Sequence, residues 1–193
     1  GDTAAEQRLL KSAEKQDTGY CFPARLDDIA VLENAILKNK NGDNAYYYLG
    51  CLFYDRFAYE KATKLWENCI ALNPNHSKAF RNLALSYFDK KGDLLSAKEC
   101  METALKNKPH DSRLIFEYQQ ILRNMNYSPE YMLKIYDKYE DLMLKRDDCY
   151  LDKLTLKCMV GEYKEAIDMA KHRRFHIYEG GEGKLTKQHA WMH

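Results

Sequence analysis

The feature that most constrains this chain is a pattern of apolar and small residues that occurs twice in succession, from position 46 to position 109. Matched positions carry residues of the same kind, and the prolines that close the two copies lie 35 residues apart. The matched residues are Tyr46, Leu49, Gly50, Phe53, Ala62, Trp66, Cys69 and Pro74 in the first copy, and Phe80, Leu83, Ala84, Tyr87, Ala97, Met101, Ala104 and Pro109 in the second. A repeat of this length is typical of arrays in which small helical or mixed units stack on one another.

The spacing inside each copy predicts a pair of helices. Residues three, four and seven positions apart lie on one face of a helix, so the apolar residues from Tyr46 to Phe53 form a single stripe. We expect the small Gly50 to let a second helix approach closely, and the large Trp66 of that helix to fill the space between the two. The proline at the end of each copy then stops the second helix, because proline cannot continue the hydrogen-bond ladder.

These residues and their spacing resemble the tetratricopeptide repeat (TPR), whose nominal period is about 34 residues. The plug position of the second helix recurs along the chain at intervals of 34, 35, 35 and 34 residues, and one extra residue in the stretch DKKGD accounts for the longer period of the second copy. The plug residues are Leu32, Trp66, Met101, Tyr136 and Ala170. The resemblance implies an all-α fold, a right-handed TPR-type superhelical solenoid of about four helix-turn-helix repeats with a non-repetitive C-terminal tail.

Outside the two clear copies the repeats diverge, as expected where one face of an end unit meets water. We expect N-terminal helices and a partial repeat over residues 1–40, the repeat array over 41–172 and a capping tail over 173–193. The divergent helices are expected over 25–40, 112–125, 128–144, 147–160 and 161–171. The helix partner of 25–40 is either the segment 3–17 or lies outside this sequence.

Composition excludes several classes of function. The 30 Lys and Arg residues and 29 Asp and Glu residues leave a net charge of +1, which gives no field to attract nucleic acid. No apolar run approaches the roughly 20 residues of a membrane helix, so we expect neither nucleic acid nor a membrane as partner.

The six cysteines form no C-x-x-C pair and are expected to be buried, reduced thiols. Because the chain opens with Gly1, we expect a piece of a longer protein. As its compartment we favour the cytoplasm over the periplasm.

The resemblance also implies a binding surface. In TPR proteins the concave face is lined by fixed positions of each first helix, and transferring them here gives an aromatic and basic groove suited to an extended peptide with apolar and acidic side chains. The candidate groove residues are Asn44, Tyr47, Tyr54, Lys78, Arg81, Leu85, Phe88 and Arg113, together with Cys51 and Phe116. The alternatives are that these are ordinary exposed residues, or that the tail folds back over them.

One specialised form of this groove is excluded by the residues present. The carboxylate clamp of chaperone-binding TPR proteins requires a set of Lys, Asn and Arg side chains, of which only Asn82 is matched outright. Glu117 stands where that clamp has a cation and would repel a carboxylate. We therefore do not expect this chain to bind the C-terminus of a chaperone.

The tail contains a second distinctive motif. Together with the stretch CFPARLDDIAVLENAI and the repeats, RRFHIYEGGEGK resembles the C-terminal repeat region of large bacterial proteins that carry an upstream β-rich domain of unassigned function, often considered sugar-related. Ile177 and Tyr178 depart from the Pro and Trp of that family. The candidate tail residues are Arg174, His176, Glu179, Glu182 and Lys184. Two roles stay open for this tail, a structural cap of the array and a binding site.

Cofactor and metal sites are not expected in the tail. A phosphate-binding loop requires Ser or Thr after the lysine of its motif, but Leu185 follows Lys184. His172 and His176 have a spacing that could hold zinc, yet Arg173 and Arg174 beside them oppose a cation.

Catalysis has no support in the sequence either, because no pair of acid and base or nucleophile and base stands out. We therefore expect a non-catalytic scaffold that binds a peptide, a protein, or the upstream domain of the same chain. The alternative is an accessory module of a carbohydrate-processing or glycan-sensing protein whose activity lies in that upstream domain.

Overall fold

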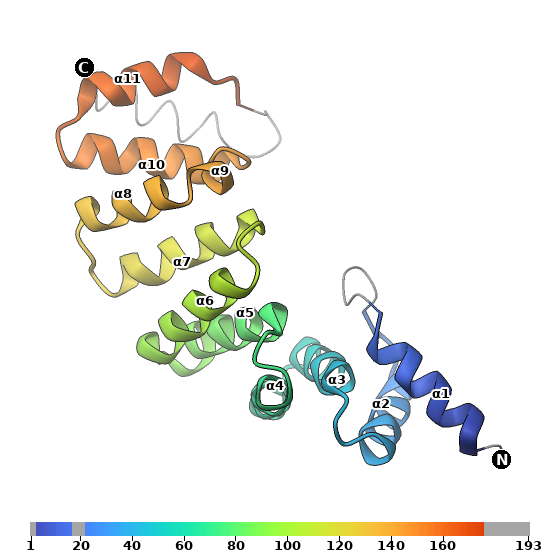
Figure 1. Ribbon diagram of the computed structural model, residues 1–193. Helices are drawn as coiled ribbons and strands as arrows, with labels where there is room; N and C mark the ends of the chain where they lie inside the picture. Colours follow the sequence, from blue (N-terminus) through green and yellow to red (C-terminus); the bar gives the residue numbers. More distant parts are fainter. Residues whose placement is uncertain (1–2, 17–21, 176–193) are drawn as a thin grey trace. The chain divides into compact units, whose positions relative to one another are not determined.

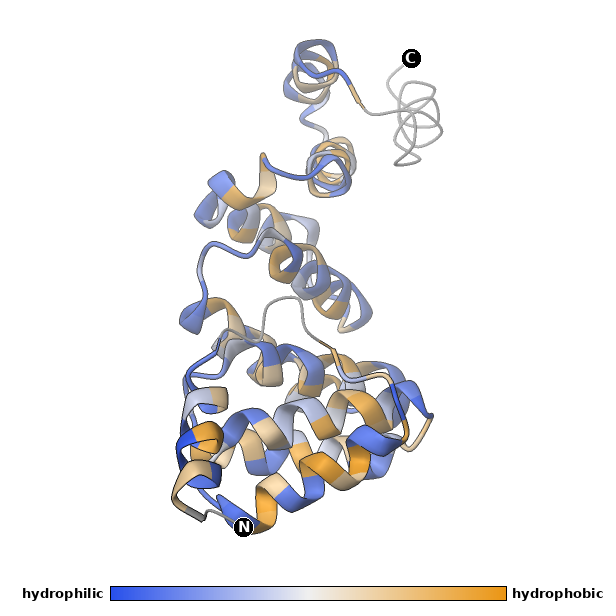
Figure 2. Ribbon diagram, turned by 90° about the vertical axis from the view of Figure 1, so that its right-hand side faces the viewer, coloured by the Kyte–Doolittle hydropathy of each residue, from blue (hydrophilic) through white to orange (hydrophobic). Residues whose placement is uncertain are grey.

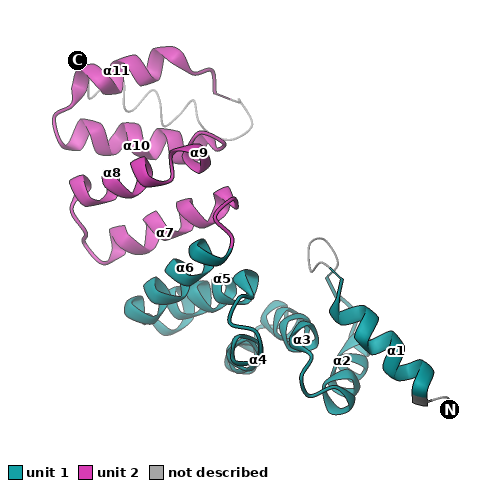
Figure 3. Cartoon of the chain, in the orientation of Figure 1, with its two compact units in different colours: residues 1–107 teal, residues 108–193 magenta. Residues whose placement is uncertain are grey.

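The computed structural model describes residues 3–16 and 22–175, which form α-helices and one π-helix and contain no β-strand (Figure 1). The helices are α1 (Thr3–Glu14), α2 (Asp27–Lys38), α3 (Asp43–Asp55), α4 (Tyr59–Leu72), α5 (Ser77–Ser86), η1 (Tyr87–Lys91), α6 (Leu94–Asn107), α7 (Ser112–Asn124), α8 (Pro129–Lys138), α9 (Glu140–Met143), α10 (Asp147–Met159) and α11 (Tyr163–His172). They belong to two compact units, residues 1–107 and 108–193 (Figure 3). Polar and apolar residues alternate in bands along the helices, as expected of amphipathic helices (Figure 2).

In unit 1 the two clear sequence repeats form the helix pairs α3–α4 and α5–α6. The expected close approach occurs at Gly50, which lies directly against the indole of Trp66. The Trp66 side chain is only 2% exposed, and its Nε1 donates a hydrogen bond to the carbonyl of Tyr47 on α3, at 3.1 Å. In the second pair Ala84 and Met101 are fully buried at the matching positions. Because small and large residues alternate across each pair, the helices pack at short range.

The extra residue of the second repeat is accommodated by a change of helix type. The first helix of this repeat is α-helical only in α5 and then passes into the five-residue π-helix η1. A π-helical turn holds one more residue than an α-helical turn, so it absorbs an insertion without displacing the helices on either side. Gly92 then ends the turn with φ of 66°, a left-handed conformation that favours glycine.

The N-terminal helices are attached less tightly. α2 packs on α3, but none of its residues is buried. α1 is joined to α2 by an ion pair between Lys38 and Glu6. At its C-terminal end, Glu14 contacts the first turn of α3.

Unit 2 contains the divergent repeats, and its core is formed by α7, α8, α9 and α10. The plug residue Tyr136 is fully buried, and its hydroxyl donates to Asp152 at 2.8 Å, which also pairs with Arg123 at 2.6 Å. The helix expected over 128–144 is interrupted at Tyr139, whose φ and ψ of −118° and 38° are not helical. The interruption turns the short helix α9 so that Leu142 and Met143 are buried. α11 covers α10 mainly through Ala166.

Candidate functional site

The predicted groove residues of α3 fall into two groups. Asn44 and Tyr47, near the start of the helix, are buried, with only 9% and 3% of their surface exposed. The Asn44 side chain donates to the carbonyl of Glu14 at 2.8 Å, and its backbone N–H donates to the Glu14 carboxylate at 3.0 Å. The end of α1 therefore covers Asn44, whereas the Tyr47 ring lies 4.7 Å from that of His76, and neither residue lines an open surface.

Farther along α3 the predicted residues do lie at an opening. Tyr54 and Leu85 line a pocket of about 170 Å³ between α3 and α5, which we call the first-helix pocket. Its remaining lining residues are Cys51, Trp66, Asn82 and Asp89. A cavity of about 150 Å³ is large enough to hold a benzene molecule. The first-helix pocket therefore has room for one aliphatic or aromatic side chain.

The walls of the first-helix pocket are neutral and its rim is charged. Burial raises the pKa of the Cys51 thiol to about 11, although the Asn82 amide donates to its sulfur at 3.5 Å, so the thiol is uncharged near neutral pH. Burial also raises the pKa of Tyr54 above its ordinary value. The Lys90 ammonium lies 6.0 Å from the centre of the Tyr54 ring, and Asp89 adds a carboxylate at the mouth. An apolar side chain in the pocket would thus have mostly neutral neighbours, with the Asn82 amide in the wall and the Asp89 carboxylate as the one charged lining group.

The other predicted groove residues are distributed over both units. Lys78, Arg81 and Phe88 lie on α5 and η1 and are half-buried, and the charge of Arg81 lowers the pKa of Cys51 against the larger effect of burial. Arg113 lies on α7 in unit 2, where it pairs with Asp111 at 2.9 Å. The first-helix pocket is thus made of unit 1 residues alone.

Three lining residues were absent from the predicted groove. Trp66 comes from a second helix, and its packing role accounts for its sequence pattern without a surface role. Asn82 matched the chaperone-type clamp position and was set aside with that clamp. Asp89 lies within the π-helix, where the extra residue changes the direction of the side chains that follow α5. Of the three, only Asn82 matched a binding position of the repeat family in the sequence.

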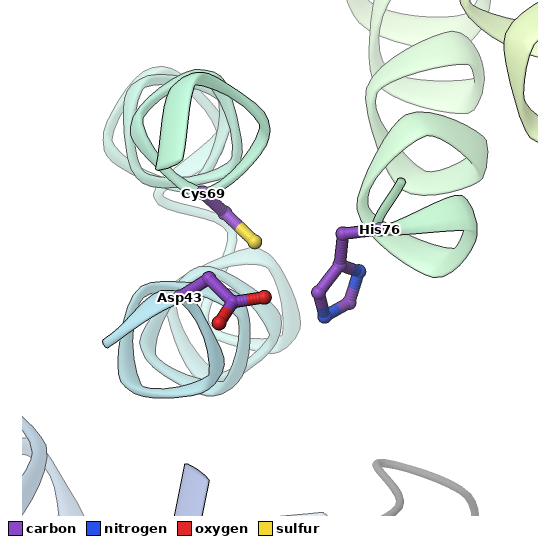
Figure 4. Close-up of side chains that lie close together, drawn as sticks. All are labelled: Asp43, Cys69 and His76. Carbon is purple, nitrogen blue, oxygen red and sulfur yellow. The ribbon is translucent and has the colours of Figure 1, made fainter. Parts of the chain in front are cut away.

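A cluster of metal-ligand residue types lies in the same unit. Asp43, Cys69 and His76 come from the start of α3, the end of α4 and the residue before α5, and their ligand atoms lie within 4.8 Å of one another (Figure 4). The His76 Nδ1 accepts the backbone N–H of Ala79 at 3.1 Å and so caps α5. Asp43 accepts a hydrogen bond from the Asn73 amide at 2.6 Å.

The hydrogen bonds of this cluster do not fit a divalent metal. Because His76 Nδ1 accepts a hydrogen bond, the neutral ring carries its proton on Nε2, the only nitrogen left to bind a metal. Without a metal, burial, followed by the nearby Asp43 carboxylate, raises the pKa of Cys69, so the thiol is protonated and an ion would have to displace its proton. Burial lowers the pKa of His76, an effect that Asp43 opposes and Lys78 reinforces. The cluster instead joins the ends of three helices through neutral side chains and one carboxylate.

The predicted tail residues lie almost entirely outside the described part of the chain. Arg174 is exposed, and His176, Glu179, Glu182 and Lys184 are beyond Phe175. The first residue of the motif makes the contacts: Arg173 donates to Asp147 at 2.7 Å and to the Leu144 carbonyl at 2.8 Å, and its guanidinium lies 4.7 Å from the centre of the Tyr150 ring. Arg173 therefore anchors the end of α11 to the start of α10.

Among residues 3–16 and 22–175, no helix is both long and apolar enough to cross a membrane. No family model matches the sequence. Solved structures do match. YrrB, described as a TPR protein with an unusual peptide-binding site, is 16% identical with a TM-score of 0.65, over 85% of this chain and 91% of that one. PilF of Pseudomonas aeruginosa is 18% identical with a TM-score of 0.60, over 82% of this chain and 71% of that one.

MamA is a third match, 13% identical with a TM-score of 0.64, over 98% of this chain and 96% of that one. Identities this low carry information about the fold rather than about ligands. The described helices and these matches confirm the predicted fold: this chain is an all-α helical array of the tetratricopeptide repeat type.

Proposed function

We propose that this chain is a non-catalytic scaffold that binds an extended segment of a partner protein at the first-helix pocket of unit 1. The observation that carries the proposal is the pocket itself, a neutral opening of about 170 Å³ between two consecutive first helices, with the Asn82 amide in its wall. A buried apolar anchor beside a polar group that fixes the backbone is the usual arrangement at peptide-binding surfaces.

The side chains of the pocket define the segment that it suits. One aliphatic or aromatic side chain would enter between Tyr54 and Leu85, where it loses contact with water. The Asn82 amide, with a donor and an acceptor group, would bond the peptide backbone next to that anchor. Lys78 and Arg81 on α5 and Lys90 on η1 are basic, so they favour acidic peptide residues on either side of the apolar anchor.

YrrB, which shares the fold, is described as having an unusual peptide-binding site, and this supports a peptide as the ligand class. The segment would belong to another protein or to the β-rich domain that the resemblance of the tail implies. Both sources present the same chemistry to the pocket.

The test is a selection of random 12-residue peptides displayed on phage against the whole chain, followed by calorimetry on the peptides obtained. We expect one apolar residue flanked by Asp or Glu to be enriched. Asn82→Ala should weaken binding by about 1–1.4 kcal/mol, a five- to tenfold rise in Kd, because one hydrogen bond to the peptide is lost. Leu85→Lys should weaken it further by placing a charge in the pocket.

Leu95→Lys is the matched control, since Leu95 on α6 is 68% exposed and does not line the pocket. Peptides that bind the Asn82 and Leu85 variants as tightly as the unchanged chain would refute the proposal. The β-rich domain, if it can be purified, would be tested against the same variants.

A further inference from the structure

A second opening in unit 1 lies on another face of α3. It is a groove of about 550 Å³ between α2 and α4, and we call it the α2–α4 groove. Its apolar lining residues are Ile36, Leu37, Tyr46, Leu49, Phe53 and Leu65. On a helix with 3.6 residues per turn, the α3 residues of this groove point away from Cys51 and Tyr54 of the first-helix pocket. The two openings therefore do not share a face of α3.

The α2 wall of this groove is unusually exposed for an apolar surface. Leu37 in this wall is 73% exposed, and α2 has no buried residue. Leaving a leucine side chain in water instead of burying it forgoes about 1.5–3 kcal/mol. Contiguous apolar surface of this kind is typical of a site that another molecule covers.

The floor of the groove has the dimensions of a helix-binding surface. Tyr46, Leu49 and Phe53 occur at intervals of three and four residues, so they form one row along α3. Seven residues of a helix span about 10 Å, or two turns. A second helix laid along this row could insert residues spaced at i, i+3 or i+4, and i+7 between α2 and α4.

The rim of the groove has an excess of positive charge. Lys61 and Lys64 lie one turn apart on α4, and both are exposed. Among the described residues, neither ammonium lies within ion-pair distance of a carboxylate, and the Lys61 ammonium instead lies 5.3 Å from the centre of the Phe53 ring. Glu33 on α2 is the one carboxylate among the lining residues. A ligand with acidic residues would therefore be favoured on the α4 side.

We propose that the α2–α4 groove binds an amphipathic helix of another protein, with its apolar stripe on α3 and its acidic residues beside Lys61 and Lys64. This site is independent of the first-helix pocket. A chain with both sites would hold one partner as an extended segment and a second as a helix.

The experiment uses two synthetic 18-residue helical peptides with the same leucine stripe, flanked by glutamates in one and by lysines in the other. Each carries a fluorescent label, and binding to the whole chain is followed by anisotropy. We expect the acidic peptide to bind at least tenfold more tightly than the basic one, and its Kd to rise as salt is added, because the exposed charges are screened.

Variants locate the site. Leu37→Asp, and separately the pair Lys61→Glu with Lys64→Glu, should each raise the Kd of the acidic peptide about tenfold, whereas Glu33→Gln should lower it. Leu95→Asp and Lys106→Glu on α6 are the matched controls, and Asn82→Ala in the first-helix pocket should leave the Kd unchanged.

Failure of the acidic peptide to bind, or equal affinity for the two peptides, would overturn the proposal. The proposal would also be overturned if the α6 controls weakened binding of the acidic peptide as much as the groove variants do. Sedimentation velocity tests whether a second copy of this chain occupies the groove. If the unchanged chain self-associates and Leu37→Asp abolishes the self-association, the groove belongs to a second copy instead.

Discussion

Replacing Gly50 by alanine tests the packing on which the repeat interpretation depends. An ideal Cβ at this position would lie 2.5 Å from Nε1 and 2.7 Å from Cδ1 of Trp66, closer than real contacts allow. The indole cannot yield easily, because it is almost fully buried and its Nε1 donates to the Tyr47 carbonyl. The substitution therefore has to move α4 away from α3 or displace the ring.

Two opposing effects set the size of the change. Alanine in place of glycine inside a helix favours folding by about 1 kcal/mol. Overpacking of a well-filled core costs about 1–3 kcal/mol, and loss of the buried hydrogen bond between Trp66 and Tyr47 costs about 1–3 kcal/mol more. We expect Gly50→Ala to lower the free energy of unfolding by about 1–3 kcal/mol, allowing for partial relaxation of the two helices.

The assay is urea unfolding followed by far-ultraviolet circular dichroism, with the same substitution repeated in a Trp66→Leu background. Leucine removes the ring that the new methyl group meets, so Gly50→Ala should there be neutral or stabilising by up to about 1 kcal/mol. If Gly50→Ala stabilises the unchanged chain by about 1 kcal/mol, the full helix-propensity gain, then the indole does not press on Gly50 and the reasoning fails.

Three further predictions concern single side chains. The pKa of His76 is lower in the folded chain than in the unfolded chain, so the unfolded chain binds more protons and stability falls as pH drops below about 6.5. The melting temperature should therefore fall between pH 7.5 and pH 5. His76→Asn keeps a helix cap but does not titrate, so it should reduce that fall. The buried Gln119 donates from Nε2 to the Met132 carbonyl at 2.9 Å, while its side-chain oxygen has no hydrogen-bond partner among the described residues. Because Gln119→Leu removes both the bond and the unsatisfied oxygen, the free energy of unfolding should change by less than about 1 kcal/mol, and a loss above about 3 kcal/mol in urea unfolding would contradict this. Arg173→Ala removes the cation that pairs with the buried carboxylate of Asp147 and should lower the free energy of unfolding by about 2–4 kcal/mol in the same assay, whereas Arg174→Ala should lower it by less than about 0.5 kcal/mol.

The sequence predicted those parts of the fold that depend on contacts within a repeat. Gly50 and Trp66 lie 16 residues apart, on two consecutive helices, and their sizes are complementary, so their contact followed from spacing alone. The helix type of η1 did not follow in the same way. An extra residue was visible in the sequence, but a loop could have absorbed it as well as a π-helical turn.

The candidate site was predicted less well, because it depends on contacts that the repeat does not encode. Tyr54 and Leu85 line the first-helix pocket as transferred from the family pattern. Asn44 and Tyr47 belong to the same transferred set, but Glu14 covers Asn44 from 30 residues upstream, the Tyr47 ring packs against His76, and α1 shows no repeat signature. Likewise, the α2–α4 groove arises because α2 leaves its apolar side uncovered, and a pattern of apolar residues does not reveal which of them stay exposed.

Mapping a selected peptide onto the chain by nuclear magnetic resonance would test the proposed function most directly. The peptide from the phage selection would be titrated into isotopically labelled chain, and the backbone and side-chain shifts assigned. We expect the largest shift changes on Tyr54, Asn82 and Leu85, and smaller changes on Tyr54 and Leu85 in Asn82→Ala at the same peptide concentration, because the Kd of that variant is five- to tenfold higher. Shift changes confined to Leu37, Phe53 and Leu65 would place the peptide in the α2–α4 groove and contradict the claim that the first-helix pocket is the binding site.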